Sequence, residues 1–181
     1  MSAIIRVVNI SKFYRVGQEK VKALVNINLE INRGEICCIL GTSGSGKSTL
    51  LNQLAGLEKP TMGKVYIGQT NISLLTEDQL AGFRQKNIGF VFQSYNLLPS
   101  MSAIENVAMP MLFRGTPREL REKEAITMLK KVGLGSRMRH KPSEMSGGQQ
   151  QRVGIARAFV AHPKIVFADE PTGNLDSRTT I

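Results

Sequence analysis

The sequence contains no tryptophan, and aromatic residues make up only 6% of its 181 positions. No apolar run approaches the ~20 residues that a membrane-spanning helix requires. The amino terminus lacks a basic region followed by a long apolar region, so we expect no secretory signal and a cytosolic location. Hydrophobic residues account for 41% of the chain, which suits one globular domain with a core and excludes wholesale disorder.

Cysteine is also scarce, and the two that are present, Cys37 and Cys38, are neighbours. Neighbouring side chains on a strand point to opposite faces, so this pair is poorly placed to form a disulfide. We expect both to be small core residues in a reducing compartment. A zinc site needs more ligands than the sequence gathers around them.

Acidic residues are outnumbered, because 24 Lys and Arg face 14 Asp and Glu, for a formal net charge of +10. Such an excess can serve nucleic acid or an anionic membrane surface. The basic residues are scattered, however, and form no long block. We therefore favour a solvated basic surface that also attracts an anionic nucleotide.

Residues 41–49 read Gly-Thr-Ser-Gly-Ser-Gly-Lys-Ser-Thr and fit the phosphate-binding pattern G-x-x-x-x-G-K-[ST]. The apolar residues 35–40 before them predict a strand and residues 50–55 a helix, which is the context the pattern needs. Glycines let backbone N–H groups cradle phosphate oxygens at a positive helix N-terminus. Lys47 then reaches the terminal phosphates, and the Ser48 hydroxyl ligates Mg²⁺. The residues expected at the nucleotide are Gly41, Ser43, Gly44, Ser45, Gly46, Lys47, Ser48 and Thr49.

Hydrophobic periodicity predicts strands at residues 4–8, 21–31, 63–68, 88–92 and 164–168, with loops at 11–17 and 94–102. Helices are expected at 76–85, 104–112, 116–133 and from Ser146 onward, with Thr116 as a cap and with Pro110 bending or shortening its helix. The order of these elements predicts one α/β domain over residues 1–181, with a helical subdomain at about 94–145.

Two adjacent carboxylates, Asp169 and Glu170, follow the apolar residues 164–168. Buried charge is costly, and ligands of open α/β sheets collect at the carboxyl ends of strands. Asp169 is therefore a candidate Mg²⁺ ligand opposite Ser48, and Glu170 a candidate general base for an attacking water. A strand end that simply meets solvent would explain the pair equally well if the phosphate loop were absent.

Residues 145–149 read Met-Ser-Gly-Gly-Gln. Ser146 stands where a helix N-cap belongs, and two glycines expose the first N–H groups of the helix, which predicts a second anion-binding terminus. An ordinary turn before a helix would explain Ser-Gly-Gly, but it would not explain why this sequence occurs together with a nucleotide-binding loop.

In order and spacing, these motifs resemble the nucleotide-binding domain of an ABC transporter ATPase along nearly the whole chain. The most specific part is Ser-Gly-Gly-Gln after a phosphate loop. The wording at residues 95–99, 105–107 and 168–177 is similar to the LolD/MacB type of lipoprotein-release and macrolide or peptide-export ATPases, with the FtsE cell-division proteins nearby. The resemblance implies an α/β P-loop NTPase core. Its mixed sheet would have a RecA-like part and an N-terminal antiparallel part, with an inserted α-helical subdomain.

The resemblance also implies roles for residues outside the phosphate loop. Tyr14 would stack on adenine, and Gln93 would touch Mg²⁺ and the lytic water and move with a membrane subunit. Asp176 would lie in a loop that crosses a dimer interface. The residues expected to meet the γ-phosphate of ATP bound to a second copy are Ser146, Gly147, Gly148 and Gln149.

On this reading the chain is an ATPase subunit that uses ATP and Mg²⁺, with Glu170, Gln93 and Lys47 as its catalytic residues. Two copies would sandwich two ATP molecules head to tail. Closure of this dimer would drive export or extraction by a membrane permease, whose coupling helix would contact the helical subdomain. We expect a peripheral protein on the cytoplasmic face of the membrane that makes no direct contact with nucleic acid.

The chain departs from the family pattern at several positions. Met145 replaces the usual leucine, which conserves volume, and Thr42 stands where proline is common. The family carries a switch histidine on a strand after the Asp176 loop, and neither His140 nor His162 occupies that place. We therefore expect a truncated chain that binds ATP but whose hydrolysis is impaired.

Two other functions fit part of the sequence. A soluble ABC ATPase acting on nucleic acid is supported by the charge of +10 alone. Translation-type members carry two such domains, and repair-type members carry long coiled-coil insertions, neither of which is seen here. A regulatory module that binds nucleotide without hydrolysing it is the third possibility.

Overall fold

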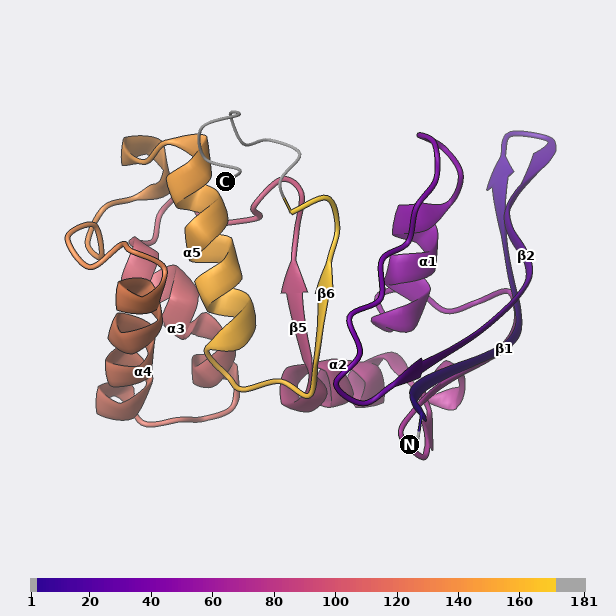
Figure 1. The fold of residues 1–181 in the computed structure, drawn as a ribbon, viewed down its shortest axis with the longest axis horizontal. Helices are drawn as coiled ribbons and strands as arrows, with labels where there is room; N and C mark the ends of the chain where they lie inside the picture. The colour runs from indigo at the N-terminus through magenta and orange to yellow at the C-terminus, as the bar shows by residue number, and fades with distance from the viewer. Residues whose placement is uncertain (1–2, 172–181) are drawn as a thin grey trace. The chain divides into compact units, whose positions relative to one another are not determined.

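The fold was analysed in a computed structural model that describes residues 3–171. The chain divides into two compact units, Met1–Ala81 and Gly82–Ile181, and each is treated by itself (Figure 1). Asp176, expected at a dimer interface, lies outside the described residues. The expectation of one domain over residues 1–181 stays a prediction.

The first unit is built on an antiparallel sheet with the strand order β2-β1-β3-β4 (Figure 1). Its strands are β1 (Ala3–Val16), β2 (Glu19–Asn32), β3 (Met62–Ile67) and β4 (Thr70–Asn71). The expected loop at residues 11–17 is wrong, because β1 continues through Val16 and pairs Tyr14 with Val21. The turn follows at Gly17, whose φ of 61° suits glycine. Residues 11–16 alternate too weakly for the sequence to reveal a long hairpin.

The expected alternation in β2 holds only over its second half. Ile27, Leu29 and Ile31 are more buried than the polar residues between them. Leu24, however, is 5% exposed while Val25 is 51% exposed. This is the reverse of the expected alternation, in which the odd-numbered residues from Val25 to Ile31 are the buried ones. The cause is a register shift in the β1–β2 ladder, where Asn26 adopts a φ of 49°. One residue of slip in a strand moves every side chain beyond it to the other face.

Helix α1 (Lys47–Leu54) follows the phosphate loop and ends in a Schellman motif. The Leu57 amide donates to the Asn52 carbonyl (2.9 Å), and the Gly56 amide donates to the Gln53 carbonyl (3.2 Å). Gly56 has a φ of 63°, and a Cβ there would lie 3.1 Å from Leu80 Cδ2, so glycine is required for both reasons. This ending turns the chain sharply after α1.

The rest of the first unit is a short 3₁₀ helix, η1 (Ile72–Leu74), and the start of α2 (Glu77–Asn87), which continues into the second unit. Thr76 and Gln79 exchange the two bonds of the capping box that their spacing predicts.

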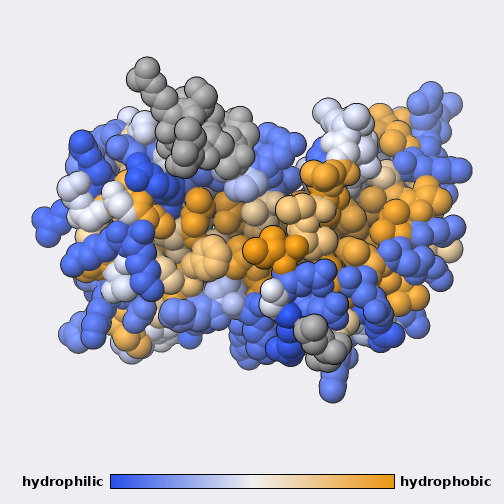
Figure 2. Space-filling model, in the orientation of Figure 1, coloured by the Kyte–Doolittle hydropathy of each residue, from blue (hydrophilic) through white to orange (hydrophobic). Residues whose placement is uncertain are grey.

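The strand expected at residues 35–40 is not formed. Ile36 is 92% exposed and Leu40 91% exposed, and hydrophobic surface is visible on the face drawn in Figure 2. Cys37 and Cys38 are exposed free thiols, so their expected place in the core is also wrong. Apolar composition alone does not make a strand, because its N–H and C=O groups need a neighbouring strand. Among residues 3–171, no strand pairs with this segment.

The second unit holds a parallel pair of strands, β5 (Ile88–Val91) and β6 (Ile165–Ala168), and three main helices (Figure 1). The helices are α3 (Ala103–Phe113), α4 (Arg118–Lys131) and α5 (Gly147–Phe159), with a 3₁₀ turn, η2 (Pro142–Glu144), before α5. Their buried side chains form one cluster that includes Val107, Leu129, Met145, Val153 and Val160. Met145, which replaces the usual leucine, is thus a core residue.

Two helix boundaries in this unit differ from expectation. Pro110 does not shorten α3, which continues to Phe113. The cap of α4 is Pro117, so the expected cap at Thr116 is wrong by one residue. The Arg121 amide donates to the Pro117 carbonyl (3.1 Å), which makes that carbonyl the first acceptor of the helix.

The strand β6 is less buried than its apolar sequence predicts, since Phe167 is its one buried residue. Among the described residues the parallel sheet has two strands, so fewer neighbours cover it than a wide parallel sheet would provide. Helix α5 lies along β5 (Figure 1), and a Cβ on Gly89 would lie 2.2 Å from the Ala158 carbonyl oxygen. Glycine at 89 therefore permits the close approach of strand and helix.

Among residues 3–171, no helix is both long enough and apolar enough to cross a bilayer.

We expect Gly89→Ala to destabilise the protein by about 1–3 kcal/mol, because the added methyl group meets helix backbone that cannot rotate away. The matched control is Gly82→Ala within α2, where a Cβ meets no atom within 4 Å. That change is expected to be stabilising by up to about 1 kcal/mol through helix propensity. Urea unfolding measures both. Equal midpoints for Gly89→Ala and the parent chain would contradict the close approach.

Candidate functional site

The phosphate loop of the first unit is shaped by two glycines with left-handed backbone. Gly44 has a φ of 79° and Gly46 a φ of 93°, and the Ser45 amide donates to the Thr42 carbonyl (3.2 Å). A Cβ on Gly46 would lie 2.7 Å from the Ala23 carbonyl oxygen, so no other residue fits without moving β2. The loop is therefore a tight turn that its own backbone geometry fixes.

The lysine of this loop folds back over it. Lys47 Nζ donates to the carbonyl oxygens of Gly41 (3.1 Å) and Thr42 (3.0 Å). Gly46 precedes α1 as its N-cap, and no side chain caps the helix. Carbonyl oxygens are weaker partners for an ammonium group than a phosphate is. The loop thus combines a helix N-terminus with a lysine held at short range. The other residues expected here, Ser43, Ser45, Ser48 and Thr49, lie on the same loop or first turn.

Tyr14, the expected adenine contact, belongs to a cluster around Glu58, which follows the end of α1 by four residues. Tyr14 Oη donates to Glu58 Oε2 (2.7 Å), and Lys12 Nζ lies 3.2 Å from the same oxygen. Burial and the bond to Glu58 raise the pKa of Tyr14, while a hydrogen bond with Thr49 opposes that rise. The bonds from Tyr14 and then from Lys12 hold the pKa of Glu58 below its ordinary value, against the effect of burial. Through Thr49 the cluster is connected to the first turn after the phosphate loop.

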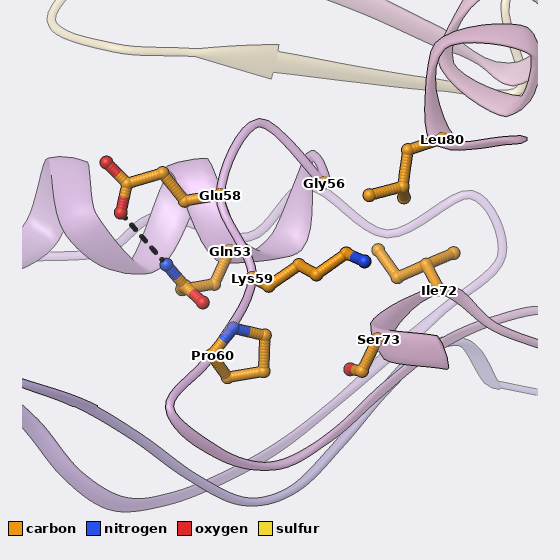
Figure 3. A pocket seen from close by; sticks show the side chains of 8 residues that line it. All are labelled: Gln53, Gly56, Glu58, Lys59, Pro60, Ile72, Ser73 and Leu80. Carbon is orange, nitrogen blue, oxygen red and sulfur yellow. Dashed lines mark hydrogen bonds between the residues drawn. The ribbon is translucent and has the colours of Figure 1, made fainter. Parts of the chain in front are cut away.

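A small pocket lies beside this cluster (Figure 3). It encloses almost no space, so we do not regard it as a nucleotide site. Gln53 lines it and donates from Nε2 to Glu58 Oε2 (3.4 Å), the dashed line in the figure. Gln53 Oε1 is buried and has no hydrogen-bond partner among the described residues.

In the second unit, the residues that follow β5 and β6 meet at the carboxyl ends of these strands. Gln93 Nε2 donates to Glu170 Oε2 (2.9 Å), across 77 residues of sequence. The Asp169 amide donates to the Val91 carbonyl (3.0 Å), which extends the pairing of the strands by one residue. Parallel strands bring their carboxyl ends to the same edge, so the structure joins two of the expected catalytic residues.

The Ser-Gly-Gly-Gln element forms the expected cap of α5. Ser146 Oγ accepts from the Gln149 amide (3.3 Å), and Gln149 Oε1 accepts from the Ser146 amide (3.1 Å). A hydroxyl group that accepts one bond still has its own hydrogen to donate. Gly147 and Gly148 add two early helix residues without side chains. The helix start is therefore ordered and accessible to an anion.

The other end of α5 holds the loop that carries Gln93. The Arg157 guanidinium donates to the carbonyl oxygens of Tyr95 (2.7 Å) and Asn96, and it lies 6.0 Å from the centre of the Phe92 ring. Tyr95 and Asn96 have φ values of 59° and 48°. Asparagine tolerates such left-handed backbone, but it is unfavourable for tyrosine, so Tyr95 needs bonds that fix it. Burial lowers the pKa of Arg157.

Glu58, Lys12 and Arg157 are absent from the residues expected from sequence. Glu58 is separated from Tyr14 by 44 positions, and no motif connects them. Arg157 lies in α5 two turns beyond the recognised element. It is four residues after Val153 and three before Val160, at the edge of the buried stripe, and no motif marks it.

We expect Arg157→Lys to loosen the loop at residues 92–96, because lysine cannot donate to two carbonyls with a rigid planar fork. The Tyr95 and Asn96 amides, which bond to Phe92 and Ser94 carbonyls, should exchange hydrogen faster, and unfolding should become easier by about 1–2 kcal/mol. Arg121→Lys is the control, since Arg121 donates to the Thr116 carbonyl in α4 instead. Unchanged exchange at 95 and 96 would show that Arg157 does not hold the loop.

Comparison with known proteins identifies the family of this chain. The family model of ABC transporters matches residues 24–173. A lipoprotein-releasing system ATP-binding protein LolD of Geobacter metallireducens is 47% identical over 99% of this chain and 80% of its own length. A macrolide export ATP-binding/permease protein MacB of Chlorobaculum tepidum is 46% identical over 98% of this chain and 27% of its own length.

Among solved structures, the dimeric post-hydrolysis state of the ATP-binding cassette MJ0796 bound to ADP and Pi has a TM-score of 0.92 and 46% identity. It covers 97% of this chain and 77% of that one. The resemblance to the LolD/MacB type and the α/β P-loop fold class are confirmed. The match spans the phosphate loop, the cap of α5 and the carboxylates after β6, and the chain belongs to the ABC transporter family of ATP-binding ATPases.

Proposed function

We propose that this chain is the ATP-binding and ATP-hydrolysing subunit of a transporter, and that it couples nucleotide-driven dimerisation to export or extraction by a membrane permease. The family match supports the ATPase, and the names of LolD and MacB support a permease partner and a place at the cytoplasmic face of the membrane. The observation that carries the proposal is the shaped phosphate loop, with Lys47 held over its carbonyls.

ATP binding would exchange the two carbonyl contacts of Lys47 for phosphate oxygens. The exchange favours the nucleotide because bonds between an ammonium and a phosphate are charge-assisted on both sides. Backbone N–H groups between Gly41 and Ser48 would take the remaining oxygens, as glycine-shaped loops before a helix do. Tyr14 would stack on the adenine ring, since its connection to Thr49 places it beside the first turn of α1.

Hydrolysis would be served by the residues after β5 and β6. Glu170 would accept a proton from the attacking water, and Gln93 would orient that water. Their hydrogen bond of 2.9 Å holds the glutamine amide at the carboxylate. Arg157 supports this geometry indirectly, because it holds the backbone carbonyl of Tyr95, two residues after Gln93.

The expected metal is Mg²⁺, and the donor set fits it. The proposed ligands are the Ser48 hydroxyl, the Gln93 side chain and the Asp169 carboxylate, which are oxygen donors of the kind Mg²⁺ prefers. Among residues 3–171 no group of three or more His, Cys, Asp or Glu side chains could hold a metal. A nucleotide-bound Mg²⁺ needs few carboxylates, because phosphates and water supply the other ligands. The ion would neutralise charge on the phosphates when bound.

A second copy of the chain would complete the site. The start of α5 presents the Ser146 hydroxyl and the amides of Gly147 and Gly148, and Gln149 braces the cap. These groups suit the γ-phosphate of ATP held by a partner's phosphate loop. The dimeric cassette structures of the related MJ0796 protein support this assembly.

We expect Lys47→Ala to weaken MgATP binding by about 10–100-fold, because a charge-assisted bond to phosphate contributes about 1.5–3 kcal/mol. Titration of a fluorescent ATP analogue measures the affinity. The control is Lys64→Ala, which removes the same charge from an exposed position of β3 in the same unit. It should leave the affinity for MgATP within about twofold of the parent chain, because surface substitutions usually have small effects. Equal affinities for the two variants would refute the loop as the ATP site.

We expect Glu170→Gln to accumulate a dimer in MgATP, because the amide cannot accept the proton of water yet still accepts the bond from Gln93. Analytical ultracentrifugation of the 181-residue chain, and of any longer chain from the same gene, gives the oligomeric state. Adding Ser146→Asp should abolish the dimer, since aspartate caps a helix as well as serine does but repels phosphate. A Glu170→Gln chain that binds ATP and stays monomeric would count against the shared site.

A further inference from the structure

Three donors converge on a single carboxylate oxygen, Glu58 Oε2. The donors are Tyr14 Oη at 2.7 Å, Lys12 Nζ at 3.2 Å and Gln53 Nε2 at 3.4 Å. The Glu58 side chain is 37% exposed and that of Lys12 17%, so neither is a freely solvated surface charge. Lys12 Nζ also donates to the Lys59 carbonyl (2.9 Å), which holds it within the cluster. A carboxylate with so many partners has a fixed position.

The backbone around Glu58 is fixed as well. Glu58 comes two residues after Gly56, where the Schellman motif ends α1, and its own amide donates to the Asn52 carbonyl (3.3 Å). The same helix begins at Lys47, directly after the phosphate loop. One eight-residue helix therefore connects the group that would bind phosphate to the carboxylate that binds Tyr14.

Tyr14 itself stands near the end of a hairpin, where little else would hold its ring. It pairs with Val21, which is 46% exposed, and its strand ends two residues later at Val16. Lys12 Nζ lies 5.2 Å from the ring centre, so one face of the ring carries a cation. A base would then stack on the opposite face. The hydroxyl bond to Glu58 is what sets the direction in which that face points.

We propose that Glu58, with Lys12, is a positioning residue that holds the Tyr14 ring ready to stack on the base of the bound nucleotide. This inference rests on the proposed ATP-binding function and assigns it a residue that no motif marks. Fixing the ring before binding removes a conformational cost that binding would otherwise bear. The hydroxyl of Tyr14 thus acts on affinity through orientation, whereas the ring acts by contact.

The experiment separates the ring from its tether. Tyr14→Ala removes both, Tyr14→Phe keeps the ring without the bond, and Glu58→Ala removes the partner. Each variant of the 181-residue chain is titrated by calorimetry with MgATP and with magnesium tripolyphosphate, which has phosphates but no base. Tyr66→Phe is the control for loss of a hydroxyl, because the Tyr66 ring in β3 contacts Arg6 and not Glu58.

We expect Tyr14→Ala to weaken ATP by about 5–100-fold, the range of base stacking on an aromatic ring. Tyr14→Phe and Glu58→Ala should each weaken ATP by about 2–10-fold, as the loss of one hydrogen bond does. The double variant Tyr14→Phe/Glu58→Ala should weaken ATP no further than Tyr14→Phe alone, because Tyr14→Phe already removes the bond to Glu58 together with the bond to Thr49. Affinity for tripolyphosphate should be unchanged throughout.

The outcomes distinguish the inference from the function on which it rests. If Tyr14→Ala weakens ATP but Tyr14→Phe and Glu58→Ala do not, the positioning role is overturned while stacking stands. If Tyr14→Ala has no effect on ATP, stacking fails and the positioning role fails with it. If Glu58→Ala weakens tripolyphosphate as much as ATP, Glu58 supports α1 and the phosphate loop, and its role at the base is rejected.

Discussion

The contact between Gly46 and the Ala23 carbonyl is the constraint on which the first unit depends. A side chain at this position would lie 2.7 Å from backbone oxygen, so the chain can turn here only through glycine with a φ of 93°. The turn starts α1 at Lys47 and directs its N-terminus at the phosphate loop. A second glycine, Gly56, ends the helix with the same left-handed backbone. Because both ends of α1 are fixed by backbone geometry, the residues beyond it, Glu58 among them, have a defined place relative to the loop.

The second unit repeats this arrangement with a different helix. Helix α5 begins at the Ser146 cap, where we propose that an anion binds, and near its last turn Arg157 holds the loop that carries Gln93. In each unit, then, one short helix connects a terminus proposed to bind phosphate with a side chain that holds a second proposed site residue. A rigid helix transmits a shift at one end to the other, whereas a flexible loop would absorb it. Binding of phosphate at the start of α5 would therefore shift the loop after β5.

Features that are satisfied within a few residues were predictable from sequence. The caps at Thr76 and Ser146 and the turn before α1 need only partners that lie within four positions, and all three are formed. The site residues that belong to motifs were found for the same reason. The cap of α4 moved to Pro117 because two adjacent residues compete for that role, and side-chain spacing alone does not choose between them.

Features that need a distant partner were not predictable. Residues 35–40 have the composition of a strand, but a strand exists only when a neighbour accepts its hydrogen bonds, and composition does not name the neighbour. The Tyr14–Glu58 bond spans 44 residues and depends on where two separate turns place their chains. The slip at Asn26 is similar, because it is set by the pairing of β1 with β2 and reverses which residues face inward. Sequence motifs thus identify the residues that we propose to touch phosphate, whereas the residues that position site side chains follow from tertiary geometry. For that reason no motif contains Glu58, which we propose to position the ring of Tyr14.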